Sequence, residues 1–299
     1  MQLTKPRTLP SQRTLNFRKW FRSFRFKTII TILIIPGAIL FIAPFLWMVS
    51  TSLKDPKLVF LMPPQLIPNP VLWDNYVRAM TRLPFGHYAM NTIQITVLCL
   101  IGHLLTASTT AYGFARLRFP GRDFLFILLI STIMLPSQVT LIPSFLIFRY
   151  LGWVDTFKPL IVPDWLGGVP FTVFLLRQFI STIPIEMDEA AKMEGASFFD
   201  IYWRIILPLI KPALAAVSIF VFLWNWNDFF YAVIYINSQD KWTLQLALNA
   251  IRRNFADRAF VEMEIIMAAS IVVMLPCLII FFTAQRLFIQ GIVFTGIKA

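Results

Sequence analysis

The chain has 299 residues, of which 58% are hydrophobic and 14% are charged, and its net charge at pH 7 is +12. A soluble domain carries roughly 25% charged residues, and the apolar residues here form blocks as long as the roughly 20 residues that a bilayer-spanning helix needs. This composition excludes an ordinary soluble domain and predicts an all-α integral membrane protein. The basic excess alone would also suit a nucleic-acid partner, but its position along the chain argues against one.

The basic residues are concentrated at the start of the chain. Residues 1–27 contain eight lysines and arginines and no acidic residue, and they directly precede the first apolar block. The positive-inside rule therefore predicts a cytoplasmic N-terminus, and a cleaved signal peptide is disfavoured because the following block is long enough to cross the membrane. We expect residues 1–28 to form a basic cytoplasmic segment and residues 29–290 the membrane domain.

Six apolar blocks predict six transmembrane helices. They cover residues 29–50, 88–112, 124–148, 158–180, 212–236 and 263–288. The third block contains Pro136 and Pro143, where we expect breaks that neighbouring helices can compensate. A basic loop around Pro120 and Gly121 belongs to the cytoplasmic side, in agreement with the N-terminus. An even number of spans returns the C-terminal tail, residues 291–299, to the cytoplasm.

The segments between the apolar blocks are predicted as loops. In the proline-rich outer loop of residues 54–87, apolar side chains at helical spacing indicate a short amphipathic helix over residues 73–80, either on the membrane surface or packed within the loop. Residues 237–262 are predicted as a second outer loop. Asp164 lies among glycines and prolines, so we expect it near the outer interface.

No pattern typical of catalysis or metal binding is found. Cys99 and Cys277 lie singly in apolar blocks, which favours a packing role, and His87 and His103 have no metal-ligand spacing. The sequence contains no motif for a phosphate-binding loop, for a nucleophile elbow or for paired catalytic carboxylates. We therefore expect no catalytic residue, metal or cofactor, and any energy for transport must come from another chain. A membrane enzyme or a scaffold without transport is the alternative class, and polar catalytic clusters within the spans would favour it.

The loop of residues 184–208 contains the longest mixed-charge stretch between two apolar blocks, residues 189–208. Pro184 suits the first position of a helix, and acidic residues occupy its opening turns. Gly195 can adopt the left-handed conformation that ends a helix, and Ser197 with Asp200 has the spacing of a capping box for a second one. These signals predict a helix-turn-helix on the cytoplasmic side, although an ordinary loop is the alternative on this physics alone.

The same stretch carries a motif, E-A-A-x3-G-x9-I-x-L-P, that is matched at every fixed position. The matching residues are Glu189, Ala190, Ala191, Gly195, Ile205, Leu207 and Pro208. With the flanking segments LLRQFISTIPIEMDEAA, WNDFF, FARLRFPGR and QRLFIQGIVFTGIK, it resembles the ABC importer permeases, in particular carbohydrate-importer permeases of the maltose-permease MalG type. The resemblance covers about residues 29–299. It departs at Glu194, where the family usually has Asp.

The resemblance implies a six-helix type I permease fold in a bacterial or archaeal cell membrane, surrounded by lipid. The implied partners are a second homologous permease subunit, an ABC ATPase dimer that binds the ATP, and an extracytoplasmic solute-binding protein. Glu189 is implied to pair with a basic residue of the ATPase. Coupling to the ATPase is implied for Glu189, Ala190, Ala191, Glu194, Gly195, Ile205, Leu207 and Pro208, and contact of the tail with the ATPase for Gly291, Thr295, Gly296 and Lys298.

A substrate pathway is predicted in the fifth apolar block. Trp224 and Asp228 are spaced i, i+4 and Asn225 and Asp228 i, i+3, so we expect them on one helix face, together with the nearby Asn227. A carboxylate at a helix centre is costly in lipid, so this face is expected to border a cavity or protein. A sugar pathway is one interpretation, and packing at a subunit interface or at an outer gate is the other. For the transported solute, the alternative to a sugar is glycerol phosphate or a polyol.

Overall fold

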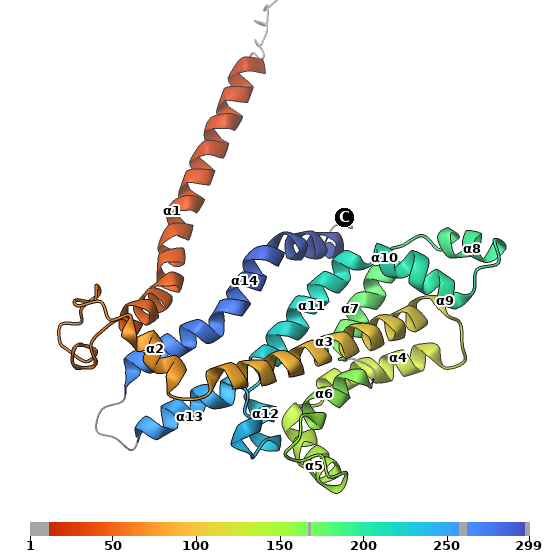
Figure 1. Ribbon diagram of the computed structural model, residues 1–299. Coiled ribbons are helices and arrows are strands. Elements are labelled where there is room, and N and C mark those ends of the chain that lie inside the picture. Colours follow the sequence, from red (N-terminus) through yellow and green to blue (C-terminus); the bar gives the residue numbers. More distant parts are fainter. Residues whose placement is uncertain (1–11, 167–168, 257–261, 297–299) are drawn as a thin grey trace, which may run out of the picture.

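The computed structural model describes residues 12–166, 169–256 and 262–296, and this part of the chain is helical with no strand (Figure 1). The α-helices are α1 Gln12–Ser52, α2 Asp74–Thr81, α3 Phe85–Arg116, α4 Arg122–Ser131, α5 Ser137–Tyr150, α6 Lys158–Trp165, α7 Pro170–Ser181, α8 Glu186–Met193, α9 Phe198–Asp200, α10 Leu207–Leu209, α11 Lys211–Trp226, α12 Phe230–Tyr235, α13 Leu244–Ala256 and α14 Met263–Gly296. Short 3-10 turns are η1 Pro56–Leu58, η2 Thr132–Met134 and η4 Gln239–Lys241, and η3 Ile201–Ile206 is a π-helix.

The described residues contain four to six segments able to cross a membrane. Four are long and apolar enough by themselves, namely Ile34–Ser52, Phe85–Arg116, Lys158–Ser181 and Met263–Gln285. Two further crossings are possible if each of two bent pairs counts as one, Arg122–Met134 with Ser137–Tyr150 and Phe198–Leu209 with Lys211–Trp226. Each of the six predicted blocks overlaps one of these segments, so the prediction of a polytopic helical membrane protein is confirmed.

Two predicted spans are interrupted; the break at Pro136 in the third was predicted, whereas the one expected at Pro143 is not found and the one in the fifth was not expected. In the third block the chain bends by 100° between η2 and α5. The bend is at Pro136, which caps α5 in an extended conformation, whereas Pro143 lies inside that helix and does not break it. In the fifth block α11 ends at Trp226, and α12 starts only at Phe230. The expectation of one helix over residues 212–236 is therefore wrong.

The predicted outer loops also contain helices. The short helix expected over residues 73–80 is present as α2, where Asn75 and Ala79 are buried and Trp73 is exposed. Residues 237–262, predicted as a loop, contain the 13-residue helix α13. Among its buried residues, Leu244, Ala247 and Ile251 repeat at i, i+3 and i+7, the spacing that marks the apolar face of a helix, and Leu246 is buried as well.

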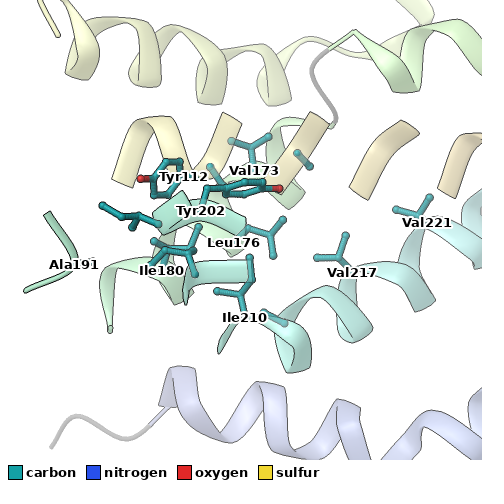
Figure 2. Close-up of a cluster of buried hydrophobic side chains, with 14 residues drawn as sticks. Tyr112, Val173, Leu176, Ile180, Ala191, Tyr202, Ile210, Val217 and Val221 are labelled. Atoms are coloured by element: carbon teal, nitrogen blue, oxygen red, sulfur yellow. The ribbon is translucent and has the colours of Figure 1, made fainter. Parts of the chain in front are cut away.

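Helix α3 lies at the centre of the packing and takes part in two buried clusters. At its C-terminal half, Tyr112 packs with α7, with the π-helix and with α11, and Figure 2 shows its ring beside that of Tyr202, 5.4 Å away. At its N-terminal half, Phe85 and Tyr88 pack with α2, α11, α13 and α14 around Trp226. Small buried residues such as Ala107 allow neighbouring helices to approach closely, as is typical of membrane bundles.

Gly102 allows α6 to approach α3. The Trp165 indole lies where a side chain at Gly102 would project, and its Nε1 donates a hydrogen bond to the carbonyl of Leu98, 3.0 Å away. Any side chain at this position would meet the indole ring. The glycine therefore fixes the packing of α6, whose residues form one wall of the cavity described below.

Candidate functional site

The first candidate region is the stretch of residues 184–208, here called the elbow. Its first helix, α8, begins at Glu186, and the amide of Asp188 donates to the carbonyl of Ile185 at 3.0 Å. The prediction that Pro184 occupies the first helical position is therefore wrong, because this proline precedes the residue that caps the helix. The acidic first turn is confirmed, and it suits the positive end of the helix dipole.

The turn after α8 has the hydrogen bonds of a Schellman motif. Gly195 has φ +86°, and its amide donates to the carbonyl of Lys192 at 2.9 Å. The amide of Ala196 donates to the carbonyl of Ala191, also at 2.9 Å. These two bonds satisfy carbonyls that the end of a helix leaves without partners. The predicted left-handed glycine is confirmed.

The predicted capping box starts the second helix of the elbow. The Asp200 amide donates to the Ser197 hydroxyl at 3.2 Å, and the Ser197 amide donates to the Asp200 carboxylate at 3.2 Å. The chain then continues as the π-helix Ile201–Ile206, which the sequence did not predict. Single π turns within helices occur frequently at functional sites.

The elbow is attached to α3 by three polar side chains, one on each of three successive turns. The Ser108 hydroxyl and the Tyr202 hydroxyl are 2.7 Å apart, and the Tyr112 hydroxyl donates to the carbonyl of Phe198 at 3.1 Å. One turn further, Arg116 Nη2 donates to the carbonyl of Ile183, the residue directly before the elbow, at 2.7 Å. Because these residues are spaced i, i+4 and i+8, they share one face of α3.

Arg116 also forms a buried ion pair with the first helix of the elbow. Its Nε lies 3.4 Å from Asp188 Oδ2, and the two side chains are only 6% and 2% exposed. Removing one partner of such a pair leaves an uncompensated buried charge, which is costly. Neither Arg116 nor Asp188 is a fixed position of the motif, and sequence reasoning missed their pairing because it joins residues far apart in the chain.

Most of the motif side chains stay outside this buried attachment. Glu189, Ala190, Glu194 and Pro208 are exposed, Ala191 is buried, and Ile205 and Leu207 are half-buried. Two large apolar neighbours are also exposed, Met193 at 90% and Phe199 at 75%. Between the two arms of the elbow is a recess of about 400 Å³, lined by Ala191, Glu194, Gly195, Ala196, Asp200, Arg204 and Ile205.

The second candidate region is a cavity of about 760 Å³ between α5, α6 and the break that separates α11 from α12. All four residues predicted for the substrate pathway line it, namely Trp224, Asn225, Asn227 and Asp228. The expectation that these residues share one helix face was wrong in part. Asp228 lies beyond the end of α11 rather than on its face, and its carboxylate accepts a hydrogen bond from the Tyr231 amide at 3.1 Å.

The opposite wall is one face of α5, which the sequence analysis missed. Ser137, Thr140, Leu141, Ser144 and Phe148 line the cavity. Their spacing of i, i+3, i+4, i+7 and i+11 is that of one helical face, so the signal was present in the sequence. The remaining walls carry Leu160, Pro163 and Asp164 from α6 and the aromatic side chains of residues 229–231 and 235.

Asp164 is part of a polar cluster that joins three helices. Its Oδ1 lies 3.1 Å from His103 Nδ1, and His103 Nε2 lies 2.8 Å from the Thr172 hydroxyl. His103 lies near the middle of α3, and the expected position of Asp164 near the outer interface stays a prediction. The carboxylate is stabilised there by an imidazole partner. Within the described residues, no group of three or more potential metal ligands is present.

The C-terminal tail is described only in part. Gly291, Thr295 and Gly296 fall in the last turns of α14, which continues beyond the predicted sixth span. Lys298 and the side-chain environment of the tail lie outside the described residues. The predicted contacts of the tail therefore stay predictions.

The comparisons with known proteins agree on one family. Residues 103–293 match the model of the binding-protein-dependent transport system inner membrane component. The diacetylchitobiose uptake system permease protein of Streptomyces coelicolor is 30% identical over 264 residues, which cover 88% of this chain and 86% of that protein. The sn-glycerol-3-phosphate transport system permease protein of Yersinia pestis is 31% identical over 270 residues, which cover 88% of this chain and 94% of that protein.

A solved structure supports the same fold. A chain from the crystal structure of a bacterial ABC transporter involved in the import of the acidic polysaccharide alginate matches with a TM-score of 0.78 at 23% identity, covering 94% of this chain and 99% of that chain. With the family match, this likeness places the helices described above in a known architecture. The chain belongs to the family of binding-protein-dependent transport system inner membrane components, and it is a permease subunit of an ABC importer rather than an enzyme.

Proposed function

We propose that this permease forms half of the translocation pathway for a sugar or oligosaccharide. Six spans, with both termini in the cytoplasm, put the elbow and the basic N-terminal segment on the same side of the membrane, in accord with the positive-inside rule. A second homologous permease subunit supplies the other half of the pathway. The cavity supports a sugar because Trp224 offers a face for stacking and Asn225 and Asn227 offer amides to hydroxyl groups.

The elbow is the proposed attachment point for an ABC ATPase dimer, which binds the ATP. The observation that carries this role is that Glu189 and Glu194 are exposed on a segment that is itself held by buried contacts to α3. A segment held in this way can transmit motion from the ATPase to the transmembrane helices. An extracytoplasmic binding protein delivers the solute at the other end. The tail, residues 291–299, is proposed to reach the same ATPase interface.

Substitution of Glu189 tests the attachment. In the complex purified from membranes, Glu189→Lys is expected to reduce the amount of ATPase that co-purifies by on the order of tenfold, because a lysine would face the basic partner implied for this position. Glu186→Lys is the matched control, since Glu186 is exposed one turn earlier on the same helix. Recovery of a wild-type amount of ATPase with Glu189→Lys would contradict the assignment.

Uptake by the whole complex tests the transported solute. The permease, the co-encoded permease, the ATPase and the binding protein are reconstituted in proteoliposomes, and ATP-dependent uptake is measured for labelled neutral disaccharides, for a polyol and for glycerol 3-phosphate. Accumulation of a sugar supports the proposal. The similarity to the Yersinia pestis permease makes glycerol phosphate the second candidate, and uptake of that solute alone would replace the sugar assignment.

A further inference from the structure

We infer that the wall of the cavity contributed by this chain discriminates against anionic solutes, and that Asp228 is the residue responsible. The inference rests on the proposed function in that it takes the cavity as part of the solute pathway. It goes further by naming the charge of the solute that this wall accepts, which is neutral or positive.

The argument begins with the charges of the lining. Among the described residues that line the cavity, the ionisable side chains besides tyrosines are the carboxylates of Asp164 and Asp228, and no lysine, arginine or histidine is present. The other polar groups are the hydroxyls of α5 and the amides of Asn225 and Asn227. An anion that loses its water here finds no positive side chain on this wall.

The two carboxylates are not equivalent, because His103 lies behind only one of them. His103 Nδ1 lies 3.1 Å from Asp164 Oδ1, and His103 Nε2 lies 2.8 Å from the Thr172 hydroxyl. Asp164 is therefore already engaged by a polar side chain from another helix.

The imidazole is buried, with 1% of its side chain exposed, so its contact with Asp164 is sheltered from water. One oxygen of Asp164 is thus held by His103 and is not free for a solute in the cavity.

Asp228 has no such partner. It lies in the break between α11 and α12, where Oδ1 accepts the hydrogen bond of the Tyr231 amide, and no ion pair to it occurs among the described residues. A backbone amide stabilises a carboxylate without cancelling its charge. The lining thus presents carboxylates and no cation, and Asp228 is the carboxylate without an imidazole partner, in surroundings where low dielectric strengthens its field.

This charge has opposite consequences for different solutes. A neutral sugar can bond to the amides and to Asp228 through its hydroxyls and can stack on Trp224, and an amino sugar would gain the attraction of Asp228. A phosphate or uronate would be desolvated beside a carboxylate of the same sign. The importer of acidic alginate shares the fold at 23% identity, and that likeness does not set the charge of this cavity.

The electrostatic field of the cavity can be measured without knowing the solute. In the assembled complex, with Cys99 and Cys277 of this chain replaced by alanine, Ser144→Cys places one thiol on the lining face of α5. Its rates of modification by a cationic and an anionic methanethiosulfonate reagent are followed by the mass of this subunit. The quantity compared is the ratio of the cationic to the anionic modification rate. An uncharged reagent corrects both rates for access to the thiol, and the same reagents on free mercaptoethanol give the reference value of this ratio.

The cationic reagent is expected to be favoured by on the order of tenfold over the reference ratio, as in clefts lined by charge of one sign. Asp228→Asn should bring the ratio back toward the reference, whereas Asp240→Asn, on an exposed turn outside the lining, should leave it unchanged. If Ser144→Cys fails to assemble, Thr140→Cys on the same face replaces it.

A ratio at or below the reference overturns the inference, and a high ratio that survives Asp228→Asn overturns the role of Asp228. Uptake measured on the same preparations separates the two proposals. Sugar uptake together with a ratio equal to the reference leaves the transport function in place and refutes the selection by charge. Absence of ATP-dependent uptake of any tested solute, with a high ratio, refutes the proposed function alone.

Discussion

The elbow is formed by one continuous stretch, residues 184–208, whereas the cavity collects its walls from α5, α6 and the α11–α12 break. Each bend of the elbow has a local cause, namely the glycine at its turn and the capping box that follows. No local sequence signal determines the cavity, because its shape depends on how α6 packs on α3 and on where α11 ends. Substitutions that alter the cavity are therefore expected to leave the elbow intact, and substitutions that alter the elbow are expected to leave the cavity intact.

The largest expected effect is at the buried ion pair between Arg116 and Asp188, which attaches the elbow to α3. Arg116→Met should destabilise the complex by about 3–5 kcal/mol, because it leaves the Asp188 carboxylate buried without its counter-charge. The midpoint of thermal unfolding measures the loss. Arg118→Met is the control, since Arg118 is exposed two residues further along.

The double substitution Arg116→Met with Asp188→Leu decides whether the pair serves stability or position. Apolar replacement of both partners is often close to neutral for stability. We expect the unfolding midpoint to recover while the coupling of ATP hydrolysis to transport stays impaired, because the bond from Arg116 to the Ile183 carbonyl is also lost. Full recovery of coupling would show that the attachment to α3 is not needed to transmit motion.

The same contrast explains what the sequence could and could not predict. The turn at Gly195 and the capping box depend on neighbouring residues, and both were predicted. The contacts of Ser108, Tyr112 and Arg116 join residues 67 to 94 positions apart in the chain, and no local pattern indicates them. The end of α11 at Trp226 was missed because Asn227 and Asp228 were taken as helical by spacing alone, although both residues are common at helix ends. Helix α13 had a readable apolar face, but the charged residues around it favoured a loop.

The next effect concerns the cavity and compares two glycines of α3. Gly102→Ala should cost about 1–3 kcal/mol, the usual cost of overpacking, because the new methyl group meets the Trp165 indole. Gly113→Ala has open space around the added group and should instead stabilise the helix by about 0.5–1 kcal/mol. We expect Gly102→Ala to lower solute uptake while the ATPase still co-purifies. Loss of the ATPase from this variant would mean that the two regions are not independent.

A smaller effect is expected at the turn of the elbow. Gly195→Val places a β-branched residue at φ +86° and should cost about 1–2 kcal/mol, with reduced transport-linked ATP hydrolysis. Gly195→Asn is the matched variant, because asparagine tolerates the left-handed conformation better than other residues with a side chain. If valine and asparagine give the same rate of coupled hydrolysis, the backbone conformation of the turn is not what matters for coupling.

The smallest effect tests a connection near the cavity that depends on charge. Asp155, in the turn between α5 and α6, accepts hydrogen bonds from the amides of Asn237 and Ser238 and pairs with Lys241 at 3.0 Å. The Ser238 hydroxyl and amide hold the pKa of Asp155 well below its usual range. Its ionised form therefore stabilises the fold above the ordinary carboxyl pKa, and the contribution is lost only as the pH falls toward the lowered pKa.

Asp155→Asn keeps a residue suited to the left-handed conformation observed here, φ 60°, and removes the charge. The expected cost is about 1 kcal/mol or less, because the ion pair is partly exposed. The difference in unfolding midpoint between the two proteins should stay constant from pH 8 to pH 5 and shrink only below about pH 4, near the ordinary pKa of aspartate. A difference that already shrinks between pH 8 and pH 5 would mean that another group carries the connection. Asp155→Asn can also be combined with Ser144→Cys. If it changes the ratio of cationic to anionic modification rates there, the loop joining α5 to α6 helps to set the shape of the cavity. The cavity then depends on contacts even further from its lining than Gly102.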